Sequence, residues 1–214
     1  PPYLLKNGDD VEVDAGVTLT VEPGTVVKND GHTTLAAAGR LIIGDPAGVD
    51  TATVVFTSID DDTVGGVTNP TSGSDLGRGE WNGLEFRDTS TGNVLVNCEI
   101  RYGGEGGDAA LSLATDSFVA FGDFSIPDSA GEGIEVLDAS PDIVNVQIRN
   151  TEQACISIDG DAELTPTIRG CLIQGGCPGI EIYGEAAPFI TECTFRGNLE
   201  YAVHNHTGVC VQAP

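Results

Sequence analysis

Three acidic residues recur at similar intervals in the C-terminal half of the chain. Glu135 lies in the segment GIEVLD, Asp159 in CISIDG and Glu181 in GIEIYG, so intervals of 24 and 22 residues separate them. Two carboxyl groups about 6.5–9.5 Å apart can serve as the acid and the base of an inverting glycosidase. These residues are therefore the catalytic candidates if the chain is a polysaccharide-active enzyme, a lyase or a glycoside hydrolase. The alternative is that they are solvent-facing positions of a sheet in an acidic chain.

Two other groups of side chains could hold a metal ion. His204 and His206 put two imidazoles on one face of a strand, but the sequence shows no third ligand beside them. The segment 58–81 is rich in oxygen ligands that suit calcium, although not at EF-hand spacing, and the alternative is a solvated loop. These oxygen ligands belong to Asp60, Asp61, Asp62, Asn69 and Asp75. The sequence predicts no cofactor unless this segment binds calcium.

Carbohydrate binding has its own candidates in Tyr183 and in the arginines Arg101, Arg149 and Arg196. Tyr183 lies beside the acidic positions, and the guanidinium groups could bind an anionic sugar. The alternative for the arginines is pairing with neighbouring acids such as Glu99, which contributes little to stability.

These residues belong to a sequence that repeats about every 23 residues. One ladder of apolar positions consists of Ile100, Ile126, Ile148, Ile173 and Phe195. A second ladder consists of Leu84, Leu111, Ile134, Ile156, Ile180 and Val203. Apolar and polar residues alternate around each position, which indicates strands and not helices.

Short strands joined by Gly, Asn, Asp or Pro corners predict one coil of a parallel β-solenoid for every 22–25 residues. We expect about nine such coils in a single domain, 1–214. Within it, 1–57 forms less regular coils, 58–81 a long loop, and 82–214 regular coils. A β-sandwich or barrel would need hairpins, and no Asn-Gly or Asp-Gly turn joins equal strands in the repeated region.

The position of each cysteine in the repeat also predicts whether it is a free thiol or part of a disulfide. Cys98, Cys171 and Cys193 fall in one inward column and are expected to be buried free thiols, because stacked side chains do not converge as a disulfide requires. Cys155 and Cys177 start adjacent coils near a corner and are the disulfide candidates.

The segments SPDIVNVQIRN, TPTIRGCLIQG and APFITECTFRG share a Pro-x-Ile pattern that resembles the right-handed parallel β-helix repeat of the pectate-lyase-like superfamily. The segment GVTLTVEPGTVVKNDGHTTLAAAGRLIIG, with VVFTSIDDDTVGG and GEWNGLEF, is similar to large bacterial and archaeal surface proteins. The resemblance covers nearly the whole chain and implies an all-β right-handed parallel β-helix. It leaves activity open, because the superfamily holds enzymes, adhesins and fibres. The signatures Asn-Thr-Asp, Gly-His-Gly and Arg-Ile-Lys of its enzymes do not occur here.

The chain carries 33 acidic and 9 basic residues, which gives a net charge of −24. This charge argues against nucleic acid as a partner, and no apolar run is long enough for membrane insertion. A high-salt setting or bound calcium would each explain the acidity. We therefore expect a secreted or cell-surface protein with a noncatalytic structural role, either fibre-forming by end-to-end stacking of coils or adhesive. The alternatives are a polysaccharide-active enzyme and a calcium-stabilised carbohydrate-binding module. The expected partners are other copies or surface domains at the solenoid ends, or a glycan.

Overall fold

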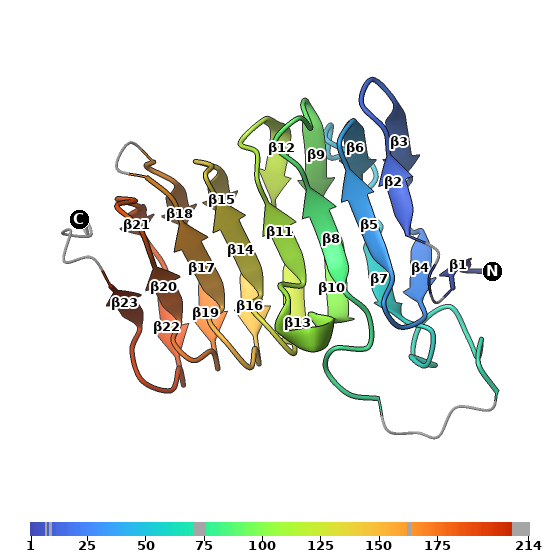
Figure 1. The fold of residues 1–214 in the computed structure, drawn as a ribbon. Coiled ribbons are helices and arrows are strands. Elements are labelled where there is room, and N and C mark those ends of the chain that lie inside the picture. Colours follow the sequence, from blue (N-terminus) through green and yellow to red (C-terminus); the bar gives the residue numbers. More distant parts are fainter. Residues whose placement is uncertain (7, 9, 71–75, 162–163, 207–214) are drawn as a thin grey trace.

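The structure is a computed structural model, and it describes residues 1–6, 8, 10–70, 76–161 and 164–206. Within these residues the chain winds repeatedly around one axis, so that short strands stack into three parallel sheets (Figure 1). The first and last strands, β1 (Tyr3–Leu5) and β23 (Val203–Asn205), lie at opposite ends of this column. The described residues contain one 3-10 turn, η1 (Glu105–Gly107), and no helix long and apolar enough to cross a membrane.

Each sheet takes one strand from successive coils. Sheet 1 consists of β1 (Tyr3–Leu5), β4 (Val26–Asn29), β7 (Val54–Ser58), β10 (Cys98–Gly103), β13 (Ser125–Ser129), β16 (Gln147–Arg149), β19 (Leu172–Gln174) and β22 (Thr194–Arg196). Sheet 2 consists of β2 (Val11–Val13), β5 (Thr34–Ala37), β8 (Gly83–Phe86), β11 (Leu111–Leu113), β14 (Ile134–Leu137), β17 (Ile156–Asp159), β20 (Ile180–Ile182) and β23 (Val203–Asn205). Sheet 3 consists of β3 (Thr18–Val21), β6 (Arg40–Ile43), β9 (Asn93–Val96), β12 (Phe118–Gly122), β15 (Asp142–Val144), β18 (Thr167–Arg169) and β21 (Phe189–Thr191).

The strand registers confirm both predicted apolar ladders. In sheet 2, Ile134 pairs with Ile156, which pairs with Ile180, and the ladder runs on in the same way at either end. In sheet 1, Ile148 pairs with Ile126 on one side and with Ile173 on the other. The Pro-x-Ile segments supply a third ladder in sheet 3, where Ile143, Ile168 and Ile190 are in register. Each coil therefore buries its apolar side against its neighbours.

Left-handed backbone conformations form one line of corners, between sheets 3 and 1. The residue just before the inward cysteine column has a positive φ in five consecutive coils. These residues are Asn97, Asp123, Asn145, Gly170 and Glu192. Gly, Asn and Asp adopt this conformation most readily, which explains why they recur at the corners. Corners also support one another, because the Asn145 amide donates to Asp123 Oδ1 at 3.2 Å.

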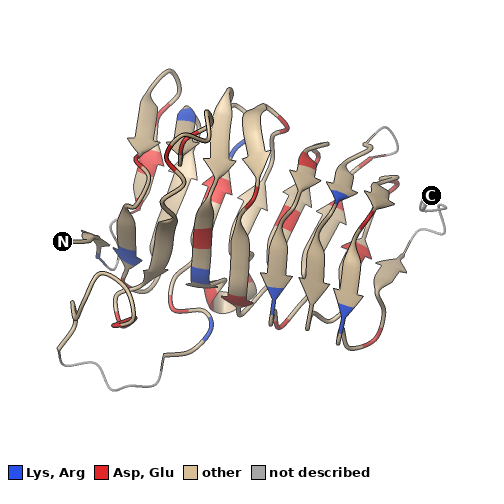
Figure 2. Cartoon of the chain, turned by 180° about the vertical axis from the view of Figure 1, so that it is seen from behind, with Lys and Arg blue, Asp and Glu red and all other residues tan. Residues whose placement is uncertain are grey.

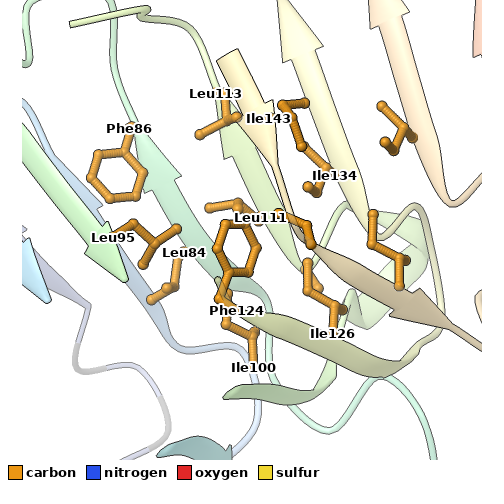
Figure 3. Close-up of a cluster of buried hydrophobic side chains, with 14 of the residues drawn as sticks. Leu84, Phe86, Leu95, Ile100, Leu111, Leu113, Phe124, Ile126, Ile134 and Ile143 are labelled. Carbon is orange, nitrogen blue, oxygen red and sulfur yellow. The ribbon is translucent and has the colours of Figure 1, made fainter. Parts of the chain in front are cut away.

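The three sheets enclose a narrow apolar core that runs the length of the column (Figure 3). Leu84, Leu111 and Ile134 project from sheet 2 toward Ile100 and Ile126 of sheet 1. Lys28 and Asp61 are the only buried charged residues in the described part of the chain. Acidic residues outnumber basic ones along the column (Figure 2).

The described residues make about eight turns, close to the prediction of about nine, since sheets 1 and 2 contain eight strands each. The difference is explained by the third coil, in which the chain leaves sheet 1 at Ser58 and enters sheet 2 only at Gly83. This insertion uses about one coil of sequence without adding a strand to any sheet. Residues 1–57 form the preceding strands of the same three sheets.

Candidate functional site

The outward face of sheet 2 carries a column in which carboxylates alternate with small side chains. By register this column reads Glu12, Ala36, Glu85, Ser112, Glu135, Ser157, Glu181 and His204. Glu135 and Glu181 therefore lie two coils apart, at roughly twice the 4.8 Å strand spacing. Asp159 lies in the adjacent column, opposite Leu137. The three catalytic candidates thus share one face.

Burial and the negative charge on this face raise the pKa of a neighbouring carboxyl group. Burial, together with the charges of Glu135 and Glu181, raises the pKa of the Glu132 carboxyl. Beside Glu135 the surface forms a depression of about 210 Å³, lined in part by Glu85 and Ser112. This volume is below the roughly 300–1,000 Å³ of typical small-molecule pockets. The face therefore concentrates negative charge without enclosing a substrate.

At the C-terminal end of this face the structure brings Glu181 together with both predicted histidine ligands. His206 Nε2 lies 2.7 Å from Glu181 Oε1, and His204 Nδ1 lies 3.8 Å from the same oxygen. The ligand atoms of all three side chains lie within 4.8 Å of one another. The sequence-based interpretation assigned Glu181 and the histidines to separate sites. The interval of one repeat between Glu181 and His204 was the signal that could have joined them.

We call Glu181, His204 and His206 the His-Glu cluster. Two tyrosine rings pack against its imidazole rings. The ring of Tyr183 stacks on His206, with centroids 4.4 Å apart and planes inclined by 7°. The ring of Tyr201 lies 4.8 Å from that of His204. Burial and the neighbouring carboxylate of Glu181 raise the pKa of Tyr183 to about 12. Tyr183 is therefore neutral and packs as an aromatic ring.

The acidic loop after β7 is organised around a lysine. Lys28 is fully buried, and its ammonium group donates to the carbonyl oxygens of Asp61 at 2.7 Å and Gly66 at 2.6 Å and to Thr68 Oγ1 at 3.1 Å. Sequence patterns missed this contact, because nothing in a strand shows that a distant loop will cover its outer side.

Protein donors also satisfy the loop carboxylates that were predicted to bind calcium. Thr57 Oγ1 donates to Asp61 at 2.7 Å, and Arg101 lies 3.1 Å from the same oxygen. Although burial opposes the effect, hydrogen bonds from Thr63 and Thr57 and the charge of Arg101 lower the pKa of Asp61. Asp60 accepts from the Asn69 amide at 2.8 Å.

The remaining calcium candidates do not complete a cation site among the described residues. Asp62 is exposed, and Asp75 lies outside the described residues. Of the calcium candidates, Asp61 contacts two cationic side chains, its carbonyl accepting from Lys28 and its carboxylate pairing with Arg101.

The carbohydrate candidates do not form one surface. Tyr183 follows β20 in sheet 2, whereas Arg101, Arg149 and Arg196 belong to sheet 1. Arg149 and Arg196 fall in one column through Gln174, but β13 is irregular and Arg101 pairs with Asp128 instead of aligning with Arg149. Arg101 pairs with Glu99 at 2.6 Å, as its alternative interpretation predicted.

The predicted disulfide is wrong: Cys155 and Cys177 are both free thiols in the structure. The backbone N–H of Cys177 donates to the carbonyl oxygen of Gln153, whereas the strand register places Gly179 opposite Cys155. The two cysteines are thus offset by two residues along the strands.

The inward cysteine column follows the prediction in two of three positions. Cys98 and Cys171 are buried free thiols, but Cys193 is only partly buried because it lies in the last coil. Burial raises the pKa of Cys98, and a hydrogen bond with Cys193 together with burial raises that of Cys171.

Thiol labelling of the folded protein should therefore follow burial. We expect iodoacetamide to modify the partly buried Cys177 and Cys193, whereas the buried Cys98, Cys155 and Cys171 react only after denaturation. Cys193 should react readily, because a hydrogen bond from Cys171 lowers its pKa to about 7. Peptide mass spectrometry before and after unfolding measures this order. Recovery of a Cys155–Cys177 disulfide peptide would contradict it.

The N-terminal end of the column is an open apolar hollow of about 390 Å³. The inward side chains of the first coil, Leu5, Val11 and Leu19, line it and are only partly buried. Among the strands that the structure describes, β1, β2 and β3 each have a neighbour on one side only, so this end also presents three strand edges without a described partner.

Comparison with known proteins supports the fold. Residues 132–213 match a family model described as a right handed beta helix region. No curated protein and no solved structure matches the chain. The three parallel sheets make the chain a parallel β-solenoid, and the match over residues 132–213 agrees with the right-handed parallel β-helix that the sequence predicted.

Proposed function

We propose that this right-handed parallel β-helix is a noncatalytic structural domain of a secreted or cell-surface protein, and that a second copy of the chain extends it at its N-terminal end. The observation that carries the proposal is the open hollow formed by Leu5, Val11 and Leu19 beside three strand edges without a described partner. Exposed edges of this kind normally require a cover or a partner.

The three-sided arrangement of the N-terminal strands determines which kind of partner can pair with them. Strands β1, β2 and β3 belong to three sheets with parallel neighbours, so a partner must present parallel strands in the same three-sided arrangement. The other end of the same molecule ends in β22, β23 and β21, which continue these three sheets in the same direction. A head-to-tail contact between copies would add these strands to the open edges. Such a contact does not close on itself and therefore builds filaments.

The charge of the chain sets the conditions for this contact. Copies that each carry a net charge of −24 repel one another, and salt screens this repulsion. We therefore expect association to increase with salt concentration. The apolar side chains of the hollow provide the favourable term, because their burial removes them from water.

The test is a substitution inside the hollow. Leu19→Lys places a charge among the inward side chains of the first coil and should abolish the association of the wild-type chain. Sedimentation velocity over a range of protein and salt concentrations measures the change in mass, and far-UV circular dichroism checks the fold. The matched control is Val119→Lys, at a position 67% exposed in the middle of sheet 3, which should associate like the wild type.

Two results would contradict the proposal. One is a wild-type chain that stays monomeric at every concentration and salt tested. The other is a folded Leu19→Lys variant that associates as strongly as the Val119→Lys control.

A further inference from the structure

We propose that the His-Glu cluster is a binding site for one divalent transition-metal ion of the zinc type. This inference goes beyond the structural role proposed above and does not depend on it. The observation that carries it is the convergence of two imidazole nitrogens and one carboxylate oxygen within 4.8 Å at the end of sheet 2.

The β-helix itself brings the ligands together. Glu181 lies on β20 and His204 on β23, and the two residues are directly paired in register. His206 follows β23, and its backbone N–H donates to the carbonyl of Ile182 at 3.0 Å. Two neighbouring strands therefore fix all three backbone positions, and metal binding does not have to order a loop. A site held on strands in this way loses little conformational entropy when an ion binds.

Aromatic packing fixes the imidazole rings as well. Tyr183 stacks on His206 with planes only 7° apart, and Tyr201 contacts His204. The two imidazole rings lie 4.1 Å apart, centroid to centroid. Glu181 is the most buried of the three, with 16% of its side chain exposed, against 34% for His204 and 37% for His206. The ligand atoms thus meet at a surface that an ion can reach from solvent.

The ligand types select the metal. Two nitrogens and one carboxylate oxygen suit zinc and its first-row neighbours, whereas calcium and magnesium prefer oxygen ligands throughout. Three protein ligands leave at least one position of a tetrahedral ion to water. This site is therefore distinct from the calcium site predicted in the loop after β7.

The surroundings favour a cation. Glu181 shares its outward column on sheet 2 with Glu85 and Glu135. A bound dication would offset part of this negative charge. A bound ion would also link β20 to β23, so binding should stabilise the last coil.

The test is a zinc titration of the chelator-treated full chain by isothermal calorimetry, in 0.5 M NaCl with millimolar Mg²⁺ to suppress binding to scattered carboxylates. We expect one zinc ion per chain. Glu181→Gln, His204→Gln and His206→Gln should each lower the affinity on the order of tenfold or more. Cobalt substitution gives a second readout, a visible absorption band that the variants should weaken.

His32→Gln is the matched control, because His32 is the only other histidine and lies beside a single carboxylate, with its Nδ1 2.9 Å from Glu105 Oε1. This variant should bind zinc like the wild type. The absence of saturable zinc binding would overturn the proposal. So would a folded His204→Gln/His206→Gln double variant that binds as tightly as the control. The Leu19→Lys variant, which should not assemble, should still bind zinc. Its zinc titration therefore tests the metal site independently of the assembly proposal.

Discussion

Replacing Trp81 with alanine should lower the free energy of unfolding by about 3–5 kcal/mol, the usual cost of removing a large buried aromatic side chain. Trp81 is fully buried at the point where the long insertion returns to the column. Its ring stacks with that of Phe56, with the two ring centroids 6.5 Å apart. Its Nε1–H donates to the carbonyl oxygen of Arg101 at 2.8 Å. The side chain thus joins the third coil to the fourth. Urea denaturation followed by circular dichroism measures the change.

Two variants separate the contributions of this tryptophan. Trp81→Phe keeps an aromatic ring but leaves the Arg101 carbonyl without its donor, so it should cost less than Trp81→Ala. Val119→Ala, at an exposed position of β12, should change the free energy of unfolding by no more than about 0.5 kcal/mol. A loss below about 1 kcal/mol for Trp81→Ala would show that the insertion is not anchored by this side chain.

Replacing Lys28 with alanine should cost about 3 kcal/mol, because three acceptors lose a charged donor inside the protein. The loop segment 59–70 should also become sensitive to proteases, since the ammonium group is what binds its carbonyls to sheet 1. Urea denaturation and limited proteolysis with mapping of the cleavage sites measure the two effects.

The chain provides its own control for the lysine. Lys6 is the only other lysine and is exposed, so Lys6→Ala should leave both measurements unchanged. Lys28→Met retains most of the volume without the charge and should resemble Lys28→Ala in the loss of loop protection. Protection of the loop in Lys28→Met equal to that of the wild type would assign the effect to packing and contradict the proposed role of the ammonium group.

The sequence was sufficient to predict the fold because a β-helix repeats one local pattern. Ile134, Ile156 and Ile180 each begin an alternating segment, and identical coils can stack only with these residues in register. The corners follow the same logic, since Asn145 and Gly170 stand where a left-handed conformation is needed. Local preference and long-range pairing agree at these positions.

The predictions failed where contacts depend on departures from the repeat. The irregular β13 moves Arg101 out of line with Arg149, and no local pattern announces such a shift. Cys155 and Cys177 lie near the same corner of adjacent coils but are offset along the strands. Only the observed strand register reveals this offset. The role of Lys28 depends on an insertion folding back over the sheet. The His-Glu cluster could have been found, because Glu181 and His204 occupy the same position in consecutive repeats.

Electron microscopy of the wild-type chain at high salt tests the central claim most directly. If copies continue one another head to tail, the particles should be unbranched filaments with an axial repeat of roughly 38 Å, the length of eight coils at about 4.8 Å each. The Leu19→Lys variant should show single particles under the same conditions. Isolated wild-type monomers, or assemblies joined side by side without this axial repeat, would contradict the account.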